Sequence, residues 1–352
     1  MNTKQALSSK PITGNSPRAL KWPRLALYSA AIWSLLYGIL GLYWALGGVG
    51  FPFGENDARG QMMGSFLSDI RADTGGIAIA ITGCVSAAAA LFMARVQGNK
   101  WQRLILLAVA WSLCAVFVAV IPDVRVLQNF AYAFMLHFHL LDWPVLNQGL
   151  CMAGGLIWGT AALAYQRQSR NACLNCGRTM DRDGASHAAS WGKKVTYLSV
   201  IMALPYGIIR WAWAAGIPLG TNPELVMGQP LMDRISEIVL GGLTIGGALL
   251  TLGLIQRWGE VFPRWCMPLA RKRVPIWLGA VPATLAAALM TNAGLKVFPH
   301  VISGIRNGSI HGGNWGELGP GLFWLPWGIS LGAAALAYYL RRRGPCKHCG
   351  RK

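Results

Sequence analysis

Four cysteines, arranged as two CxxC pairs, are the residues of this 352-residue chain whose type and spacing point most directly to chemistry. Cys173 and Cys176 are followed by Gly-Arg, and Cys346 and Cys349 are followed by the same two residues. Two thiolates two residues apart, with a glycine that lets backbone N–H groups approach sulfur, form a zinc knuckle. A structural zinc site takes four ligands in a tetrahedron. We therefore expect the two knuckles to bind one zinc ion together.

Two other uses of these thiols stay open. They could be redox-active, as in a thiol oxidoreductase or a metal-responsive signalling protein, or they could be inert residues inherited with a duplication. The two pairs are much farther apart in sequence than those of a usual zinc module, so a joint site requires the fold to bring them together. His187 and His348 are possible substitute ligands. The other four cysteines are interpreted as small apolar packing residues: Cys84, Cys114, Cys151 and Cys266.

Each knuckle ends a longer repeated segment. Residues 159–178 read GTAALAYQRQSRNACLNCGR and residues 332–351 read GAAALAYYLRRRGPCKHCGR, with eleven of twenty positions identical and no gap. Chance would give roughly one or two identities at ordinary residue frequencies. Tyr-Gly-Ile followed by Trp-Ala also recurs at one spacing, from Tyr37 and from Tyr206. The chain is therefore predicted to be an internal duplication.

The elements that must position these residues are membrane helices. The chain is 54% hydrophobic and only 13% charged, a balance typical of a polytopic membrane protein rather than of a soluble domain. A helix needs about 20 apolar residues to cross the hydrocarbon core of a bilayer. Eight apolar runs reach that length: 24–48, 74–95, 101–121, 144–166, 194–216, 235–257, 273–294 and 320–341. The predicted fold class is all-α, a polytopic helical membrane protein.

The eight predicted spans divide into two parallel four-helix repeats. Four is an even number, so both halves enter and leave the membrane in the same orientation. The predicted units are a basic N-terminus (1–23), a first repeat ending in CxxCGR (24–178), a linker (179–193) and a second repeat ending in CxxCGR (194–352). Both knuckles are then expected on the same side of the membrane.

The distribution of basic residues predicts which side that is. Of 32 Lys and Arg, 25 lie in the N-terminus, in the three connections after spans 2, 4 and 6, and in the C-terminus. Basic loops stay on the cytoplasmic side, so both termini are predicted to be cytoplasmic in an inner (plasma) membrane. The net charge of +19 is therefore explained by the orientation of the chain in the membrane and by contact of its basic loops with membrane lipids. No nucleic-acid partner is expected.

A second repeated group of residues lies at the opposite, outward side. Asp69 and Asp73 in the first half match Asp233 and Glu237 in the second, and a spacing of four puts both acids on one helix face. The structural interpretation is that they cap helices and complement the helix dipole. The functional interpretation is an outward-facing acidic and aromatic pocket between the halves, with Arg210 either binding a ligand anion or, as we favour, paired with Glu237 or Asp73.

Three classes of function remain. The first is a membrane protein that binds or translocates a small amphiphilic molecule in that pocket, with the halves clipped by zinc. The second is a membrane-embedded enzyme that uses Asp73 or Glu237 as a general acid on an isoprenoid-like substrate. The third is redox or metal-responsive action through the CxxC pairs. His137, His139 and Asp142 also resemble a metal half-site by spacing, against interfacial residues of an amphipathic segment.

One short segment carries a resemblance. Residues 44–48 read WALGG, and in its layout the chain resembles bacterial multi-pass membrane proteins of unknown function that carry a segment of this kind. The resemblance implies an integral membrane location and no particular activity. No catalytic residue or cofactor is carried over from it.

Overall fold

The structure is a computed structural model that describes residues 21–63, 65–96, 98–134, 136–138, 140–178, 184–346 and 348–350, without the side chains of 184–189. In these residues it contains helices and no β-strand, apart from an isolated bridge between Val261 and Arg273. The predicted all-α class is confirmed.

Each half of the chain contributes four long helices and several short ones. The long helices of the first half are α1 (Trp22–Ala45), α3 (Ala72–Arg95), α4 (Lys100–Ala115) with the π-helical turn η2 (Val116–Val120), and α6 (Trp143–Ser169). Those of the second half are α7 (Gly184–Ala214), α9 (Leu231–Leu252), α10 (Ile276–Arg306) and α12 (Trp324–Arg342). The short elements are η1 (Gly54–Asn56), α2 (Ala58–Met62), α5 (Val124–Ala133), α8 (Pro223–Met227), η3 (Arg257–Gly259), η4 (Met267–Leu269), α11 (Trp315–Leu318) and η5 (Gly319–Phe323).

Seven helical segments in the described part of the chain are long and apolar enough to cross a membrane. They are Trp22–Ala45, Ala72–Arg95, Lys100–Val120, Ser190–Ala214, Leu231–Leu252, Ile276–Arg306 and Trp315–Arg342. The predicted span 144–166 falls in α6, a helix of 27 residues that is not among the seven. Polar residues such as Asn147 and Gln148 near its start lower its mean hydropathy. Length and hydropathy therefore support seven of the eight predicted spans.

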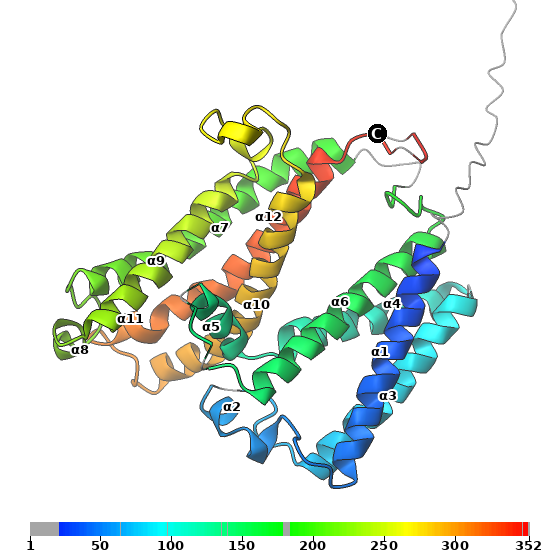
Figure 1. Cartoon of the computed structure of the whole chain (residues 1–352), viewed down its shortest axis with the longest axis horizontal. Coiled ribbons are helices and arrows are strands. Elements are labelled where there is room, and N and C mark those ends of the chain that lie inside the picture. The colour runs from blue at the N-terminus through cyan, green and yellow to red at the C-terminus, as the bar shows by residue number, and fades with distance from the viewer. Residues whose placement is uncertain are drawn as a thin grey trace, which may run out of the picture.

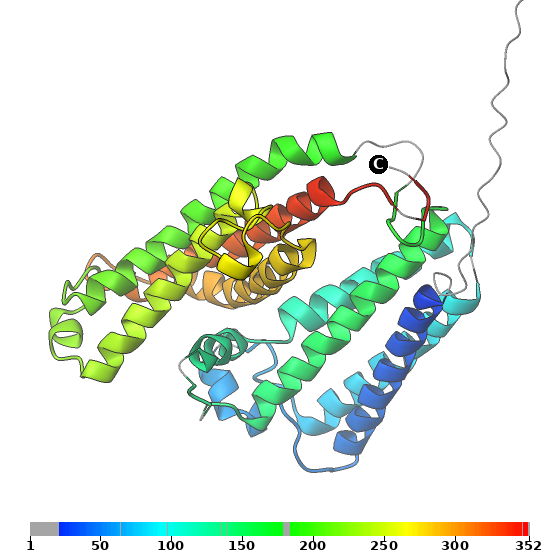
Figure 2. The ribbon, with the colours of Figure 1, turned by 45° about the horizontal axis from the view of Figure 1, so that its top comes forward.

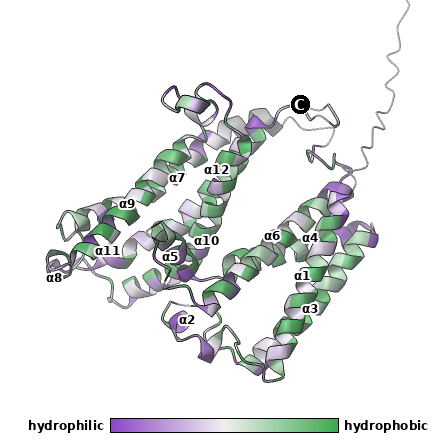
Figure 3. Ribbon diagram, in the orientation of Figure 1, coloured by the Kyte–Doolittle hydropathy of each residue, from purple (hydrophilic) through white to green (hydrophobic). Residues whose placement is uncertain are grey.

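The long helices form two bundles, one from each half (Figures 1 and 2). In the first bundle α1 packs on α3 and α6, and α4 packs on α6. In the second, α12 packs on α10 and α7, and α7 packs on α9. Apolar residues run along these helices, and hydrophilic residues gather at their ends and in the connections (Figure 3). Large apolar side chains that remain exposed, such as Leu25, Ile32 and Leu36, suit contact with lipid tails.

Small residues let neighbouring helices approach closely. A Cβ atom added to Gly83 in α3 would lie 2.6 Å from the Cα of Gly38 in α1, nearer than real Cβ contacts come. Close backbone approach at glycine is a common way for helices to gain van der Waals contact in a membrane, where no hydrophobic force drives helices together. Trp44, Trp158 and Tyr165 are the largest fully buried aromatic side chains in the core of the first bundle.

The connection between the two halves is shorter than predicted. Helix α7 begins at Gly184, so residues 184–193 of the predicted linker are helical, and residues 179–183 lie outside the described part. The alanines of this stretch have high helix propensity, which lets the helix extend beyond the apolar span. Most of the predicted basic N-terminus, residues 1–20, also lies outside the described residues.

Candidate metal centre

The structure brings all four cysteines of the two CxxC pairs together. Their Sγ atoms all lie within 4.8 Å of one another. Cys173 faces Cys346 at 4.0 Å, and Cys176 faces Cys349 at 3.6 Å. Each of these contacts joins one half to the other, across a sequence separation of 173 residues. The predicted joint site therefore has its ligands in place.

The two knuckles follow the last long helix of each half. α6 ends at Ser169 and α12 ends at Arg342, and the segment after α12 runs across to the segment after α6 (Figures 1 and 2). Each knuckle closes with a backbone hydrogen bond: Gly177 N–H donates to the Cys173 carbonyl (2.7 Å), and Gly350 N–H donates to the Cys346 carbonyl (2.8 Å).

The glycines are required for these two tight turns. Gly177 has φ +70° and Gly350 has φ +69°, a left-handed conformation that side chains with a Cβ atom disfavour. The backbone N–H of His348 donates to Cys346 Sγ at 3.4 Å, so His348 meets the cluster through its backbone. The ring of His187 belongs to the side chains outside the described part.

Arginines hold the two knuckles against each other. Arg178 donates to the carbonyls of Arg343 and Gly344, both at 3.0 Å, and Arg343 donates to the carbonyl of Cys176 at 3.1 Å. Each half thus sends a guanidinium to the backbone of the other. Within the first knuckle, Arg167 donates to the Leu174 carbonyl at 2.8 Å. The hydrogen bonds of Arg178 and Arg343 cross between the halves in both directions and so fix the two knuckles relative to each other.

The thiols of the cluster differ in acidity when no metal is bound. Burial raises the pKa of Cys176 to about 12, and contact with the neighbouring thiols adds to that increase. At Cys346 burial acts in the same direction, but backbone N–H groups of Cys349 and His348 outweigh it and lower the pKa to about 6. One sulfur therefore ionises easily, and a divalent cation is needed to hold all four as thiolates.

The spacing of the sulfur atoms fits a tetrahedral zinc ion. With zinc–sulfur bonds of about 2.3 Å, neighbouring sulfurs of a tetrahedron are about 3.8 Å apart. The cross-half distances of 3.6 and 4.0 Å bracket that value. A disulfide would require about 2.05 Å, and all four cysteines are free thiols. The donor set and the spacing both fit Zn(Cys)4.

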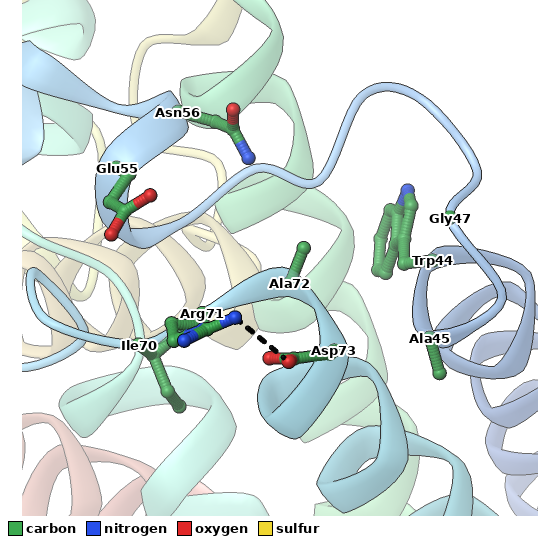
Figure 4. A pocket seen from close by; sticks show the side chains of 9 residues that line it. All are labelled: Trp44, Ala45, Gly47, Glu55, Asn56, Ile70, Arg71, Ala72 and Asp73. Atoms are coloured by element: carbon green, nitrogen blue, oxygen red, sulfur yellow. Dashed lines mark ion pairs between the residues drawn. The ribbon is translucent and has the colours of Figure 1, made fainter.

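The acidic residues of the predicted outward pocket lie at the start of α3 in the first half and on α9 in the second. Asp73 lies in the first turn of helix α3 and pairs with Arg71 at 3.3 Å, with both side chains more than half exposed. It lines a cavity of about 310 Å³ together with Trp44, Glu55 and Arg71 (Figure 4). Asp69 accepts a hydrogen bond from Ser68 and does not line this cavity. The cavity lies within the first half, between the end of α1 and the start of α3.

In the second half the favoured ion pair is present. Arg210 of α7 donates to both carboxylate oxygens of Glu237 of α9, at 2.9 and 3.0 Å, and its guanidinium lies over the rings of Tyr206 and Trp213. Asp233 lies in the first turn of α9. Burial in apolar surroundings favours the protonated carboxyl that general-acid catalysis uses, whereas a neighbouring guanidinium favours the carboxylate. Glu237 and Asp73 are each paired with an arginine, so their surroundings do not support the acid-catalysis hypothesis.

The histidine-containing segment also has a structural role. Asp142 caps helix α6 through the N–H of Val145 at 3.1 Å and pairs with Arg59 at 2.7 Å. His139 lies outside the described residues.

A buried charge network that the sequence analysis did not single out lies at the end of the bundle opposite the cysteines. Arg125 of α5 is fully buried and donates to both oxygens of Asp57 (2.7 and 2.5 Å) and of Asp123. Gln148 of α6 donates to Asp123 at 2.8 Å and accepts from its backbone N–H at 3.0 Å. Burial lowers the pKa of Arg125, but the hydrogen bonds to the two carboxylates outweigh it, so the net pKa is raised.

This network also joins the two halves. From α10, Asn292 donates to the carbonyls of Ala119 (3.0 Å) and Pro122 (2.5 Å), and Lys296 donates to the carbonyl of Val120 at 2.6 Å. In the sequence, Lys296 lies two residues beyond the predicted span 273–294, whereas in the structure the helix continues to Arg306 and contains it. A lysine this close to an apolar run is the signal that indicates a need for a partner.

No protein-family model, curated protein or solved structure matches this chain.

Proposed function

We propose that this chain is an integral membrane protein whose two four-helix repeats are joined at their cytoplasmic ends by one structural zinc ion. Cys173, Cys176, Cys346 and Cys349 are its ligands. The observation that carries the proposal is the convergence of two thiols from each half at tetrahedral spacing. Zinc bound by four protein ligands has no open coordination position, so its role is to fix structure rather than to activate water.

The course of the chain supports an eighth membrane crossing by α6. Arg167, at the end of α6, stacks over Trp22, at the start of α1, with 5.4 Å to the ring centroid. The start of α1 and the end of α6 therefore lie on the same side. Three crossings by α1, α3 and α4 place the end of η2 on the other side, so α6 must cross back. Asn147 and Gln148 of α6 are tolerated in a membrane helix because both are buried against protein and hydrogen-bonded.

The second half then needs an even number of crossings to return its knuckle to the first. Helices α7, α9, α10 and α12 provide four. The excess of Lys and Arg on the cysteine side supports a cytoplasmic position for both knuckles and both termini, in an inner (plasma) membrane. The reducing cytoplasm keeps thiols available for metal.

Metal analysis of the purified full-length chain tests this proposal. Protein extracted in mild detergent without added metal should contain one zinc per chain, and replacing all four cluster cysteines by serine should abolish it. Cys84→Ser and Cys266→Ser, which alter cysteines outside the cluster, are the matched controls and should keep the metal. Wild-type protein with intact thiols and no bound zinc would overturn the assignment, as would an equal loss of zinc in the controls.

A second candidate function rests on the cavity beside Asp73. Arg71 offers a cation, Asp73 and Glu55 offer carboxylates, and Trp44 forms a wall of the cavity (Figure 4). Positive and negative side chains beside an aromatic ring can bind the zwitterionic headgroup of a small amphiphile. The cavity lies at the membrane face away from the cysteines. Saturable binding of lysophosphatidylethanolamine, weakened by Asp73→Asn and unchanged by Asp233→Asn, would support this function. Equal binding to all three proteins would contradict it.

A further inference from the structure

The buried network of the first half is not electrically neutral by itself. Asp57 and Asp123 contribute two carboxylates and Arg125 contributes one guanidinium, and all three side chains are at most 6% exposed. A buried charge without compensation is costly, because the protein interior does not replace the hydration that the charge loses. The first half therefore needs one more positive charge at this place.

The second half supplies that charge through Lys296. Its side chain is 1% exposed, and its Nζ lies 2.6 Å from the Val120 carbonyl and 3.3 Å from the centroid of the Phe66 ring. Asp123 interacts with it electrostatically. A carbonyl acceptor, an aromatic face and a nearby carboxylate are the three features that proteins use to bind an ammonium group.

The local backbone explains why carbonyl groups are free to bind this cation. A continuing helix would satisfy the carbonyls of residues 117–120 with the N–H groups four residues on, 121–124, or, in a π-helical turn such as η2, with those five residues on, 122–125. Here Pro122 has no N–H, the N–H of Asp123 donates to Gln148, and the N–H of Arg125 donates to the Asp123 side chain. The carbonyls of Ala119 and Val120 thus point to the other half and accept from Asn292 and Lys296.

We propose that the first half carries a binding site for a primary ammonium group, and that Lys296 of the second half is its intramolecular ligand. The site consists of the Val120 carbonyl and the Phe66 ring, and the Asp123 carboxylate adds electrostatic attraction without touching the ammonium group. Docking of Lys296 in it joins the two bundles at the end opposite the cysteines, whether or not the cysteines hold metal.

A primary alkylammonium ion is the chemical class that fits this site. An –NH₃⁺ group offers three donors from one compact nitrogen. The nitrogen of Lys296 lies 2.6 Å from the Val120 carbonyl oxygen and 3.3 Å from the centroid of the Phe66 ring, and a compact nitrogen can meet both distances. A quaternary ammonium has no N–H donor for the carbonyl, and a planar guanidinium is wider than the ammonium. Beside the site, the buried Oδ1 of Asn292 has no hydrogen-bond partner and is a further acceptor.

Chemical rescue of a Lys296→Ala variant tests the proposal. The atoms removed correspond to n-propylammonium, so this ion should reconstitute the missing side chain. Full-length Lys296→Ala in detergent should unfold at a temperature lower by roughly 5 °C or more. Millimolar n-propylammonium should restore at least half of that loss, and it should slow hydrogen exchange of the 116–126 peptide. Sodium and tetramethylammonium at the same ionic strength should do neither.

Two further variants keep the test decisive if Lys296→Ala is poorly folded. Lys296→Met fills the space without a charge, so it should show faster exchange of the 116–126 peptide and no response to n-propylammonium. Lys194→Ala removes an exposed lysine of α7 and should match the wild type with and without the ion. Equal responses of all variants to n-propylammonium would overturn the proposal. The proposal would also be overturned if the 116–126 peptide exchanged hydrogen at the wild-type rate in both Lys296→Ala and Lys296→Met.

Discussion

The two halves of the chain meet at two ends that use opposite kinds of chemistry. At the cysteine end, each half contributes the same motif, and the four Sγ atoms lie within 4.8 Å of one another. At the other end the contributions differ: backbone carbonyls and acids from the first half accept from Asn292 and Lys296 of the second. A contact built from repeated motifs can be recognised in a sequence, whereas a contact built from unlike partners becomes visible only when the chain is folded.

The two ends also differ in what holds them. The cysteine end needs an ion from outside the chain, so its strength depends on metal supply. The Lys296 end is complete within the chain and depends on desolvated charges, which are strong when paired and costly when one partner is removed. The following changes separate the two ends, from the largest expected effect to the smallest.

Removal of the metal should affect the cysteine end most. Structural zinc in small zinc domains is worth on the order of 10 kcal/mol. A strong chelator should therefore release the 170–178 and 344–350 segments, detected as faster hydrogen exchange there, while the 116–126 peptide at the Lys296 end keeps its protection. Full thermal stability and unchanged exchange after complete zinc removal would show that the metal does not join the halves.

Breaking the buried network should affect the Lys296 end instead. Arg125→Met leaves Asp57 and Asp123 buried without their guanidinium, at a cost of about 3–5 kcal/mol in free energy of unfolding. Zinc content should not change. Denaturant unfolding and metal analysis of the same preparation measure both properties. A variant that loses zinc in proportion to its stability would mean that the two ends are not independent.

An intermediate effect is expected from Arg178→Ala. This change removes the hydrogen bonds from Arg178 to the carbonyls of Arg343 and Gly344. Residues that support metal ligands typically change metal affinity about 10-fold or more when removed. Zinc should remain bound but be lost at a lower concentration of a competing chelator. Arg170→Ala, on the neighbouring exposed turn, is the control and should have wild-type affinity.

The Arg210–Glu237 pair lies inside the second half and should leave both ends intact. Glu237→Gln removes a charge-assisted pair that is largely buried, and hydrogen bonds to charged groups contribute about 2 kcal/mol. The loss should appear in the unfolding free energy alone. Faster exchange at either end would place this ion pair in the coupling between the halves.

The exposed pair of Arg71 and Asp73 should show the smallest effect. Both side chains are more than half exposed, and such pairs contribute less than about 1 kcal/mol. Arg71→Ala should therefore be close to the wild type in stability, which gives a baseline for the other variants. A loss as large as that of Arg125→Met would mean that solvent exposure does not separate the two kinds of ion pair.

Sequence analysis could predict the helical membrane class and the cysteine cluster because both depend on local signals. Apolar runs of span length identify helices, and the matched CxxCGR endings identify ligands that share one context. It could also predict Arg210 as a paired residue, because a charge within a span needs a partner. The partner, Glu237, was one of two candidates, and only the packing of α7 on α9 selects it.

The remainder depended on tertiary structure. Asp123 looks like an ordinary helix cap in the sequence, and it does cap α5 through the N–H of Arg125. Its contacts with Gln148 and with the Arg125 side chain arise because α5 and α6 fold back on the end of η2. A pocket shared by the acids of both halves stays a prediction, because repeat position alone does not determine which side chains converge. The apolar run 144–166 predicts a span that the mean hydropathy of α6 does not support, and only the folded structure shows that Asn147 and Gln148 of this helix have hydrogen-bond partners.

The sequence separation of the contacts between the halves has a consequence of its own. The two cysteine contacts and the contact between Ala119 and Asn292 each join residues that lie 173 positions apart, and Asp123 and Lys296 differ by the same interval. In a dimer of identical subunits, a residue on the twofold axis can only meet its own copy. Cysteines suit such a position, because each cysteine and its copy supply two thiols to the same metal site. A charged residue on such an axis would be repelled by its copy, whereas two halves of one chain can carry an acid at one position and a lysine at the other.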